Sequence, residues 1–442
     1  MGVVREIVAA RYYGTTGPAS AFTLAFQIPN LVRSLFADAA ISAAFVPVFT
    51  ELLEKGKRRE AFELAGSLLL VILAALGAIS LFFIVFAGQI MPLFIGDEFT
   101  PYLTHLTVVM SQLLFPIVVL LGVNGLVVGI LNAYEHFTIP ALAPLVWNLM
   151  IIVSLIALRP LFSVGHEIYA YAVGVLLGTI VQLAMSIPPL RHLDFKFSFR
   201  GSLRNPRIAQ VLKLMLPVTI GLGVINFDLV INSSLGSLVS VEAPRAIDAA
   251  FRVYMLPQGM FSVALATVLF PTLSRYAARN DLDGLRATMA TGMRAIFLLL
   301  IPAATFTFVM ATPIVRLIYQ HGVFGPKSTD RVSTALFWFS FSLPFAGVNL
   351  LLTRTFFSLQ RPWIPTALAT ANLVVNALIS LALYKPLGIA GLVIGTAVAS
   401  AGMTFSQAFY LRRELHGRLE GGRTLMAVLQ MSVASAALGG VS

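Results

Sequence analysis

The chain of 442 residues contains no cysteine, which excludes a disulfide framework, a thiolate metal site and a cysteine nucleophile. Charged residues make up only 11% of it, whereas an average soluble domain has about a quarter. The six histidines fall at or near predicted connections without the spacing of metal ligands. Walker motifs, glycine-rich phosphate loops and nucleophile elbows are also absent from the sequence. We therefore expect neither catalytic residues nor a metal centre, and no ATP hydrolysis by the chain itself.

The abundant component is apolar. Hydrophobic residues account for 58% of the chain, and the mean hydropathy is +0.89. Long runs such as 64–96, 99–134 and 136–158 contain no Asp, Glu, Lys or Arg. Each exceeds the roughly 20 residues that a helix needs to cross the hydrocarbon core of a bilayer. The sequence therefore predicts an all-α polytopic membrane protein.

The net charge of +11 would suggest a nucleic-acid partner in a soluble protein, but its distribution indicates membrane topology instead. Basic residues concentrate in alternate connections, including 55–59, 191–207 and 412–423, which are cytoplasmic by the positive-inside rule. We expect no nucleic acid. The predicted helices are 2–15, 17–51, 61–95, 101–134, 138–160, 167–190, 208–238, 244–275, 285–318, 330–359, 363–384, 388–414 and one that begins near 424.

A weak internal repeat recurs at a spacing of 225 residues. The tripeptide Gly122-Val123-Asn124 matches Gly347-Val348-Asn349, and Ile139-Pro140 matches Ile364-Pro365. Six predicted helices separate equivalent points, so the copies should be parallel, related by a pseudo-two-fold axis along the membrane normal, with the substrate site between them. We predict an N-terminal lobe at 1–190, a basic cytoplasmic linker at 191–207, a C-terminal lobe at 208–414 and the start of a thirteenth helix at 424–442. The short first helix and the final apolar run make both ends look clipped.

Four arginines lie inside these apolar segments: Arg5, Arg11, Arg33 and Arg252. Each would oppose insertion by roughly 2.5 to 3.5 kcal/mol if it faced lipid, so we expect them to face a hydrated interior. Guanidinium groups match phosphate oxygens, which predicts a site for an anionic, phosphorylated substrate. Three alternatives stay open: Arg5 reaches the cytoplasmic surface, Arg33 pairs with Asp38, or Arg252 pairs with Asp248 one turn earlier.

A second group of polar residues is rich in oxygen. Asp228 is an isolated carboxylate in an apolar helix, Asn372 and Asn376 share a helix face, and Thr396 follows Gly395. Such oxygens suit Na⁺ or a proton better than a divalent metal. The alternative is ordinary hydrogen bonding between helices. We expect no cofactor, and uphill transport would draw on an ion gradient or the membrane potential.

Three stretches, 4–11, 25–37 and 259–275, resemble the MurJ (MviN) lipid II flippase family of the multidrug/oligosaccharidyl-lipid/polysaccharide exporter superfamily. The resemblance covers essentially the whole chain. It implies fourteen transmembrane helices, arranged as two six-helix lobes and a C-terminal pair that forms a lipid-tail groove. It also implies that the four arginines engage the pyrophosphate and headgroup of the undecaprenyl-linked peptidoglycan precursor.

The chain departs from the family pattern at several acidic positions. Ser20 stands where the family often has an acidic residue before Ala-Phe, and Phe251 replaces the acidic residue before Arg252. We expect a flippase that moves lipid II across the bacterial cytoplasmic membrane by alternating access, with lipid II and the bilayer as its partners. The alternatives are an exporter of another polyprenyl-linked glycan, a cation-coupled multidrug antiporter and a scaffold that does not transport.

Overall fold

The computed structural model describes residues 1–36, 38–193, 195, 206–415 and 419–440, which are helical wherever they form regular structure. Nine of the described helical segments are long and apolar enough to cross a membrane, which confirms the all-α polytopic fold. The chain divides into two compact units, Met1–Val230 (unit 1) and Ile231–Ser442 (unit 2), and the division falls within one helix, α9. Most of the predicted linker at 191–207 lies outside the described residues.

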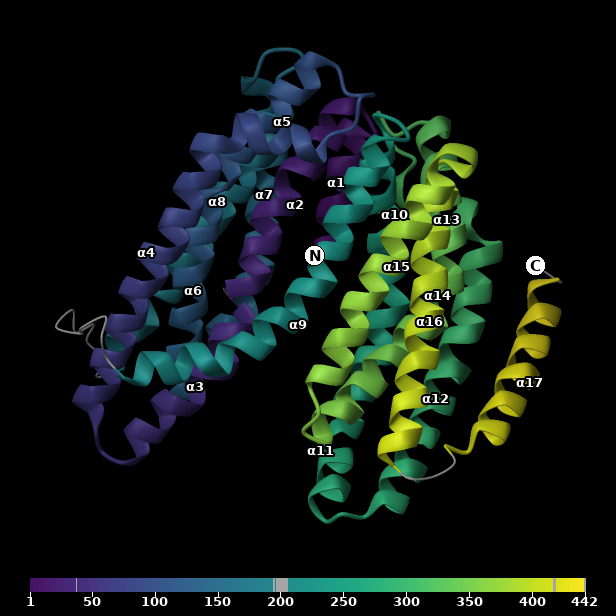
Figure 1. Ribbon diagram of the computed structural model, residues 1–442. Coiled ribbons are helices and arrows are strands. Elements are labelled where there is room, and N and C mark those ends of the chain that lie inside the picture. The colour runs from purple at the N-terminus through teal and green to yellow at the C-terminus, as the bar shows by residue number, and fades with distance from the viewer. Residues whose placement is uncertain (37, 194, 196–205, 416–418, 441–442) are drawn as a thin grey trace. The chain divides into compact units, whose positions relative to one another are not determined.

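Unit 1 contains eight α-helices and most of a ninth, within the described ranges (Figure 1). In it α7 packs along α8, α6 packs against α3 and α4, α2 packs along α5, and α1 lies against α7. The helices are α1 (Gly2–Tyr13), α2 (Gly17–Phe36), α3 (Asp38–Glu54), α4 (Arg58–Ile90), α5 (Pro101–Leu114), α6 (Pro116–Ala133), α7 (Thr138–Leu158), α8 (Tyr169–Ser186) and α9 (Pro206–Ser237), with 3₁₀ turns η1 (Met91–Phe94), η2 (Arg159–Leu161) and η3 (Pro188–His192).

Unit 2 is built around α14, which contacts α10, α11, α12, α13 and α16. The helix α17, yellow in Figure 1, packs on α12. The elements after α9 are α10 (Ala243–Pro257), the π-helix η4 (Gln258–Val263), α11 (Ala264–Ala278), α12 (Leu282–Val309), α13 (Ala311–Tyr319), α14 (Pro326–Ser358), α15 (Trp363–Leu387), α16 (Ile389–Glu414) and α17 (Gly421–Gly439).

Four predicted helices are in fact divided. The predicted helix 17–51 corresponds to α2 and α3, and the predicted helix 285–318 corresponds to α12 and α13, which are separated at Met310. The other two divisions occur at proline. The predicted helix 101–134 is split at Phe115, because Pro116 has no N–H to continue the hydrogen-bond ladder. The predicted helix 244–275 contains the π-helix η4 directly after Pro257. Proline breaks helices in this way, and π-helical turns occur frequently at functional sites. Both breaks lie in otherwise continuous membrane-length segments.

Candidate functional site

Arg5 lies near the start of α1 and is buried, with 6% of the residue exposed. Its Nη2 and Nε donate to the same oxygen, Oε1 of Glu6, at 2.7 and 3.3 Å. Consecutive residues of a helix point about 100° apart, so this pair requires both side chains to turn toward the same neighbours. Glu6 is 1% exposed and also accepts a hydrogen bond from the Tyr171 hydroxyl at 3.2 Å. This burial does not match the alternative in which Arg5 reaches the cytoplasmic surface.

Aromatic side chains from three other helices surround this ion pair. The Arg5 guanidinium carbon lies 5.0 Å from the ring centroid of Trp147 on α7. The indole Nε1 donates to Thr179 Oγ1 on α8 at 3.1 Å. Tyr171, also on α8, stacks on Phe22 of α2 with 4.0 Å between ring centroids. The position of Arg5 is therefore set by α2, α7 and α8 as well as by its own helix.

The other two arginines of unit 1 differ in their surroundings. Arg11 is exposed on α1 and has no hydrogen-bond or ion-pair partner among the residues that the structure describes. Arg33 on α2 donates from Nε and Nη2 to Oδ1 of Asn30, at 3.1 and 2.9 Å. Asp38 begins α3, but its side chain lies outside the described residues, so the Arg33–Asp38 pair stays a prediction.

Arg252 forms a two-point ion pair with a carboxylate on its own helix. Its Nε and Nη2 donate to Asp248 Oδ2 and Oδ1 at 3.1 and 3.3 Å. Arg245, which is only 4% exposed, donates to the same Oδ2 at 3.0 Å. The three residues stand at i, i+3 and i+7 of α10, on one helix face. Arg245 is the second residue of the predicted helix 244–275 and was not among the predicted site residues, although its spacing from Asp248 and Arg252 is readable in the sequence.

Part of the predicted oxygen-rich group comes together in unit 2. Asn376 Nδ2 on α15 donates to Asn232 Oδ1 on α9 at 3.3 Å, and Asn232 Nδ2 donates to Thr396 Oγ1 on α16 at 3.4 Å. Thr396 Oγ1 and Ser380 Oγ lie 3.5 and 3.2 Å from Asn376 Oδ1. Asn232 and Ser380 were not anticipated from the sequence. These hydrogen bonds match the alternative stated from the sequence, in which polar side chains form ordinary hydrogen bonds between helices.

The remaining two members of that group lie one turn from it along their own helices. Asp228 is half-buried on α9, four residues before Asn232. Asn372 precedes Asn376 on α15, and its buried Oδ1 has no hydrogen-bond partner among the described residues. Within the same residues no three His, Asp or Glu side chains are grouped closely enough to hold a metal ion. The oxygens that could bind an ion here belong mainly to neutral amide and hydroxyl groups.

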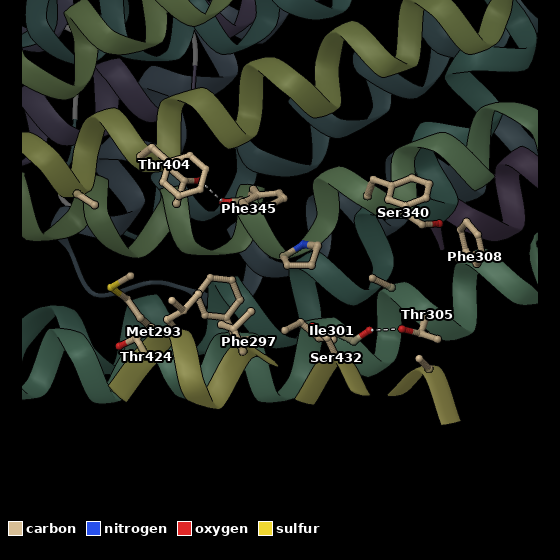
Figure 2. Close-up of a pocket in the computed structure, with 18 of the residues that line it drawn as sticks. Met293, Phe297, Ile301, Thr305, Phe308, Ser340, Phe345, Thr404, Thr424 and Ser432 are labelled. Carbon is tan, nitrogen blue, oxygen red and sulfur yellow. Dashed lines mark hydrogen bonds between the residues drawn. The ribbon is translucent and has the colours of Figure 1, made fainter. Parts of the chain in front are cut away.

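A cavity of about 830 Å³ lies between α12, α14, α16 and α17 in unit 2. Figure 2 shows the α12 residues Met293, Phe297 and Ile301 along one side, with Phe345 and Thr404 along the opposite side. Leu419, which precedes α17, also lines the cavity, together with Gly421, Thr424 and Leu425 in the first turns of that helix. Most of the lining side chains are apolar, so the cavity suits a hydrocarbon chain.

The family model for "Lipid II flippase MurJ" matches residues 9–442. The chain belongs to the MurJ family. It is 30% identical over 404 residues to the lipid II flippase MurJ of Burkholderia cenocepacia, covering 90% of this chain and 78% of the relative. A probable lipid II flippase MurJ of Treponema pallidum is 27% identical over 422 residues, which cover 93% of this chain and 79% of the relative.

Solved structures show the same fold. A lipid II flippase MurJ in an inward closed conformation superposes with a TM-score of 0.84 at 22% identity, covering 100% of this chain and 89% of the other. An inward-facing multidrug resistance MATE family transporter of the MOP superfamily gives 0.83 at 13% identity, over 94% and 95% of the two chains. The predicted membership in the MurJ family is confirmed. The chain is thus a multi-pass protein of the bacterial inner membrane and a flippase rather than an enzyme.

Proposed function

We propose that the chain moves lipid II from the cytoplasmic to the outer leaflet of the inner membrane by alternating access. The match of residues 9–442 to the MurJ family carries this proposal. The arginines support it from physics, because Arg5, Arg11, Arg33 and Arg252 are permanent cations on the helices α1, α2 and α10. A diphosphate presents several anionic oxygens to such groups, and two-point contacts with guanidinium are the strongest of their kind.

The carboxylates beside the arginines suggest how binding begins. Glu6 and Asp248 hold Arg5 and Arg252 at hydrogen-bonding distance before substrate arrives. A buried guanidinium without any anion would destabilise the protein by several kcal/mol. The diphosphate exchanges with these carboxylates for the guanidinium donors, so the cations stay compensated in both states. Arg11, which is exposed and without a described partner, makes the first contact with the headgroup.

The cavity beside α17 receives part of the undecaprenyl chain. Its aromatic and aliphatic lining would bind isoprene units in place of bulk lipid. The headgroup would stay outside the cavity and free to bind arginine. The prenyl chain remains in an apolar environment throughout, and the polar headgroup alone needs a hydrated path. Because the arginines bind the headgroup and the cavity binds only part of the prenyl chain, the protein would accept lipids that differ in chain length.

Na⁺ or a proton drives the transport cycle through the oxygen-rich residues Asp228, Asn372, Asn376 and Thr396, or else the membrane potential does so directly. The buried, unpartnered Oδ1 of Asn372 supports an ion in this region. A proteoliposome assay with the Na⁺ gradient, the proton gradient and the potential imposed one at a time would separate these sources. Asn372→Leu should abolish dependence on Na⁺ if that ion is used, and leave the response to potential unchanged.

The direct test of the function is flipping of labelled lipid II in proteoliposomes. Arg252→Glu should reduce the rate at least a hundredfold, because it places a carboxylate where phosphate must bind. Arg275→Glu is the matched control: this exposed arginine at the end of α11 contacts Thr272, and its reversal should change the rate less than twofold. Wild-type flipping of undecaprenyl-linked glycans without the peptide, but not of lipid II, would instead favour the related exporter. Equal rates for Arg252→Glu and the wild type would refute the assigned role of the arginine.

A further inference from the structure

We propose that Trp147 is a positioning residue that holds the Arg5 guanidinium in place for the diphosphate, a role that rests on the proposed function. The indole offers the π face on which the cation lies, at 5.0 Å from the ring centroid to the guanidinium carbon. A cation over a tryptophan ring is attracted by the ring quadrupole, and the attraction grows when both groups are shielded from water. Arg5 is buried, so this condition holds.

The indole is itself fixed by α8. Its Nε1 donates to Thr179 Oγ1 at 3.1 Å, and Thr179 in turn donates to the carbonyl of Val175 at 2.8 Å. Gly178 allows α8 to approach closely, because a Cβ there would lie 3.0 Å from the Trp147 carbonyl oxygen and 3.3 Å from its Cδ1. The hydrogen bond to Thr179 and the close packing of Gly178 against Cδ1 therefore both fix the edge of the indole that carries Nε1.

A cation–π contact draws on the charge of the guanidinium and does not use any of its N–H donors. Arginine has five N–H donors, of which Nε and one Nη2 hydrogen are directed to Glu6, so three have no partner among the described residues. Those remaining donors lie in the guanidinium plane, where phosphate oxygens are bound. When phosphate replaces Glu6, the contact with Trp147 persists. The arginine then changes its anion without changing its position, which reduces the ordering required at binding.

The chain permits a sharp test because it has three tryptophans, Trp147, Trp338 and Trp363. Trp338→Phe with Trp363→Phe leaves Trp147 as the single indole in the full-length protein. Incorporating mono-, di- and trifluorinated tryptophan then withdraws electron density from this ring stepwise at nearly constant shape. We expect the affinity for undecaprenyl diphosphate in nanodiscs to fall progressively, reaching about tenfold with the most fluorinated ring. The melting temperature should stay constant across the series.

Three further variants separate positioning from packing. Thr179→Val keeps the ring but removes the acceptor of its N–H, and should weaken binding about threefold, whereas Gly178→Ala should displace the indole and weaken binding more. Arg5→Gln should change the emission of the single tryptophan before any substrate is added. In the Arg5→Gln background, fluorination should no longer alter affinity.

The outcomes distinguish this proposal from the function on which it rests. Affinity that is independent of fluorination, while the single-tryptophan protein still flips lipid II, overturns the role of Trp147 and leaves the flippase intact. Unchanged emission in Arg5→Gln also overturns it, because the two groups would then not be in contact. Failure of the single-tryptophan protein and the wild type alike to bind undecaprenyl diphosphate or to flip lipid II overturns both proposals. Inorganic pyrophosphate, tested beside the lipid, reports whether the diphosphate alone is recognised.

Discussion

Units 1 and 2 share a packing pattern at their repeated Gly-Val-Asn tripeptides. A Cβ at Gly122 on α6 would lie 2.3 Å from Leu76 on α4, and one at Gly347 on α14 would lie 2.2 Å from Leu300 on α12. Leu76 and Leu300 are 224 residues apart, close to the spacing of the repeat. In both units the absence of a side chain on the glycine lets a central helix approach its neighbour. The internal repeat of the sequence therefore corresponds to the same contact built twice.

The asparagine of each tripeptide also accepts a hydrogen bond from a hydroxyl group on another helix of its own unit. Asn124 Oδ1 accepts from Ser186 on α8 at 3.0 Å, and Asn349 Oδ1 accepts from Thr404 on α16 at 2.8 Å. Asn349 additionally donates to the Ser400 carbonyl at 3.0 Å. Buried polar groups need such partners, so these asparagines join α6 to α8 in unit 1 and α14 to α16 in unit 2.

The two units differ in how they pair their buried arginines and in whether they contain an apolar cavity, within the residues that the structure describes. Unit 1 compensates Arg5 with Glu6 and an aromatic ring, whereas unit 2 places one carboxylate, Asp248, between Arg245 and Arg252. Unit 2 also has α17 and the cavity beside it. The packing that both copies of the repeat share supports the fold. We infer that the parts that differ between the units bind the substrate: the arginines bind the headgroup, and the cavity in unit 2 binds the hydrocarbon chain.

The largest effect that would test this asymmetry comes from Asp248→Asn. It removes the carboxylate that two guanidiniums share in a nearly buried position, and such a loss destabilises a protein by about 3–5 kcal/mol. Glu6→Gln should be milder, because Trp147 still faces the Arg5 cation. Thermal unfolding of both variants in nanodiscs measures the difference.

The control for this pair is Arg245→Met combined with Asp248→Leu, which replaces a buried ion pair by apolar groups and should recover most of the lost stability. Flipping by that double variant should remain impaired, since Arg252 loses its anchoring carboxylate. Equal destabilisation by Asp248→Asn and Glu6→Gln would contradict the distinction drawn between the two units.

A smaller effect tests the shared packing. Gly122→Val and Gly347→Val should each destabilise the protein by about 1–3 kcal/mol, because their side chains would overlap Leu76 and Leu300. Gly77→Val on α4 is the matched control, as nothing lies within 4 Å of a Cβ at Gly77. Unfolding midpoints in one detergent rank the three. A large loss at one tripeptide and none at the other would mean that the repeated sequence no longer serves one structural purpose.

The sequence predicted the features that depend on long, regular patterns. Apolar runs predicted the membrane helices to within a few residues at most boundaries. The repeated Gly-Val-Asn indicated a duplicated chain, and the structure packs the two tripeptides alike. The arginines stood out because a permanent charge is costly in an apolar segment. Asp248 was readable as a partner of Arg252 because they are four residues apart on one helix.

The parts that could not be predicted depend on contacts between helices. Glu6 adjoins Arg5 in the sequence, and helical geometry turns neighbouring residues apart, so their ion pair requires Trp147 and Tyr171 from elsewhere. Tryptophan in an apolar helix looks like ordinary core, and nothing in the sequence alone connects it with α1. The cavity is formed by four helices together, and the local sequence pattern of each helix does not predict the space between them.

The smallest effect concerns α17, which unit 2 has in addition to the repeat. Arg294 on α12 donates to Glu420 Oε2 at 2.7 Å, just before α17 begins, and this hydrogen bond lowers the pKa of the Glu420 carboxyl below its ordinary value of 4.5. A carboxyl whose pKa is lower in the folded state stabilises it above the unfolded pKa, and the contribution disappears as pH falls through the folded value. Hydrogen exchange should therefore show α17 amides protected equally at neutral pH and pH 5, and less protected by about pH 3. Glu420→Gln should make this profile flat and insensitive to salt, with α15 as the internal reference. If α17 of the variant keeps the wild-type pH profile, a titratable group other than Glu420 produces the pH dependence, and the hydrogen bond from Arg294 to Glu420 does not hold the helix to α12.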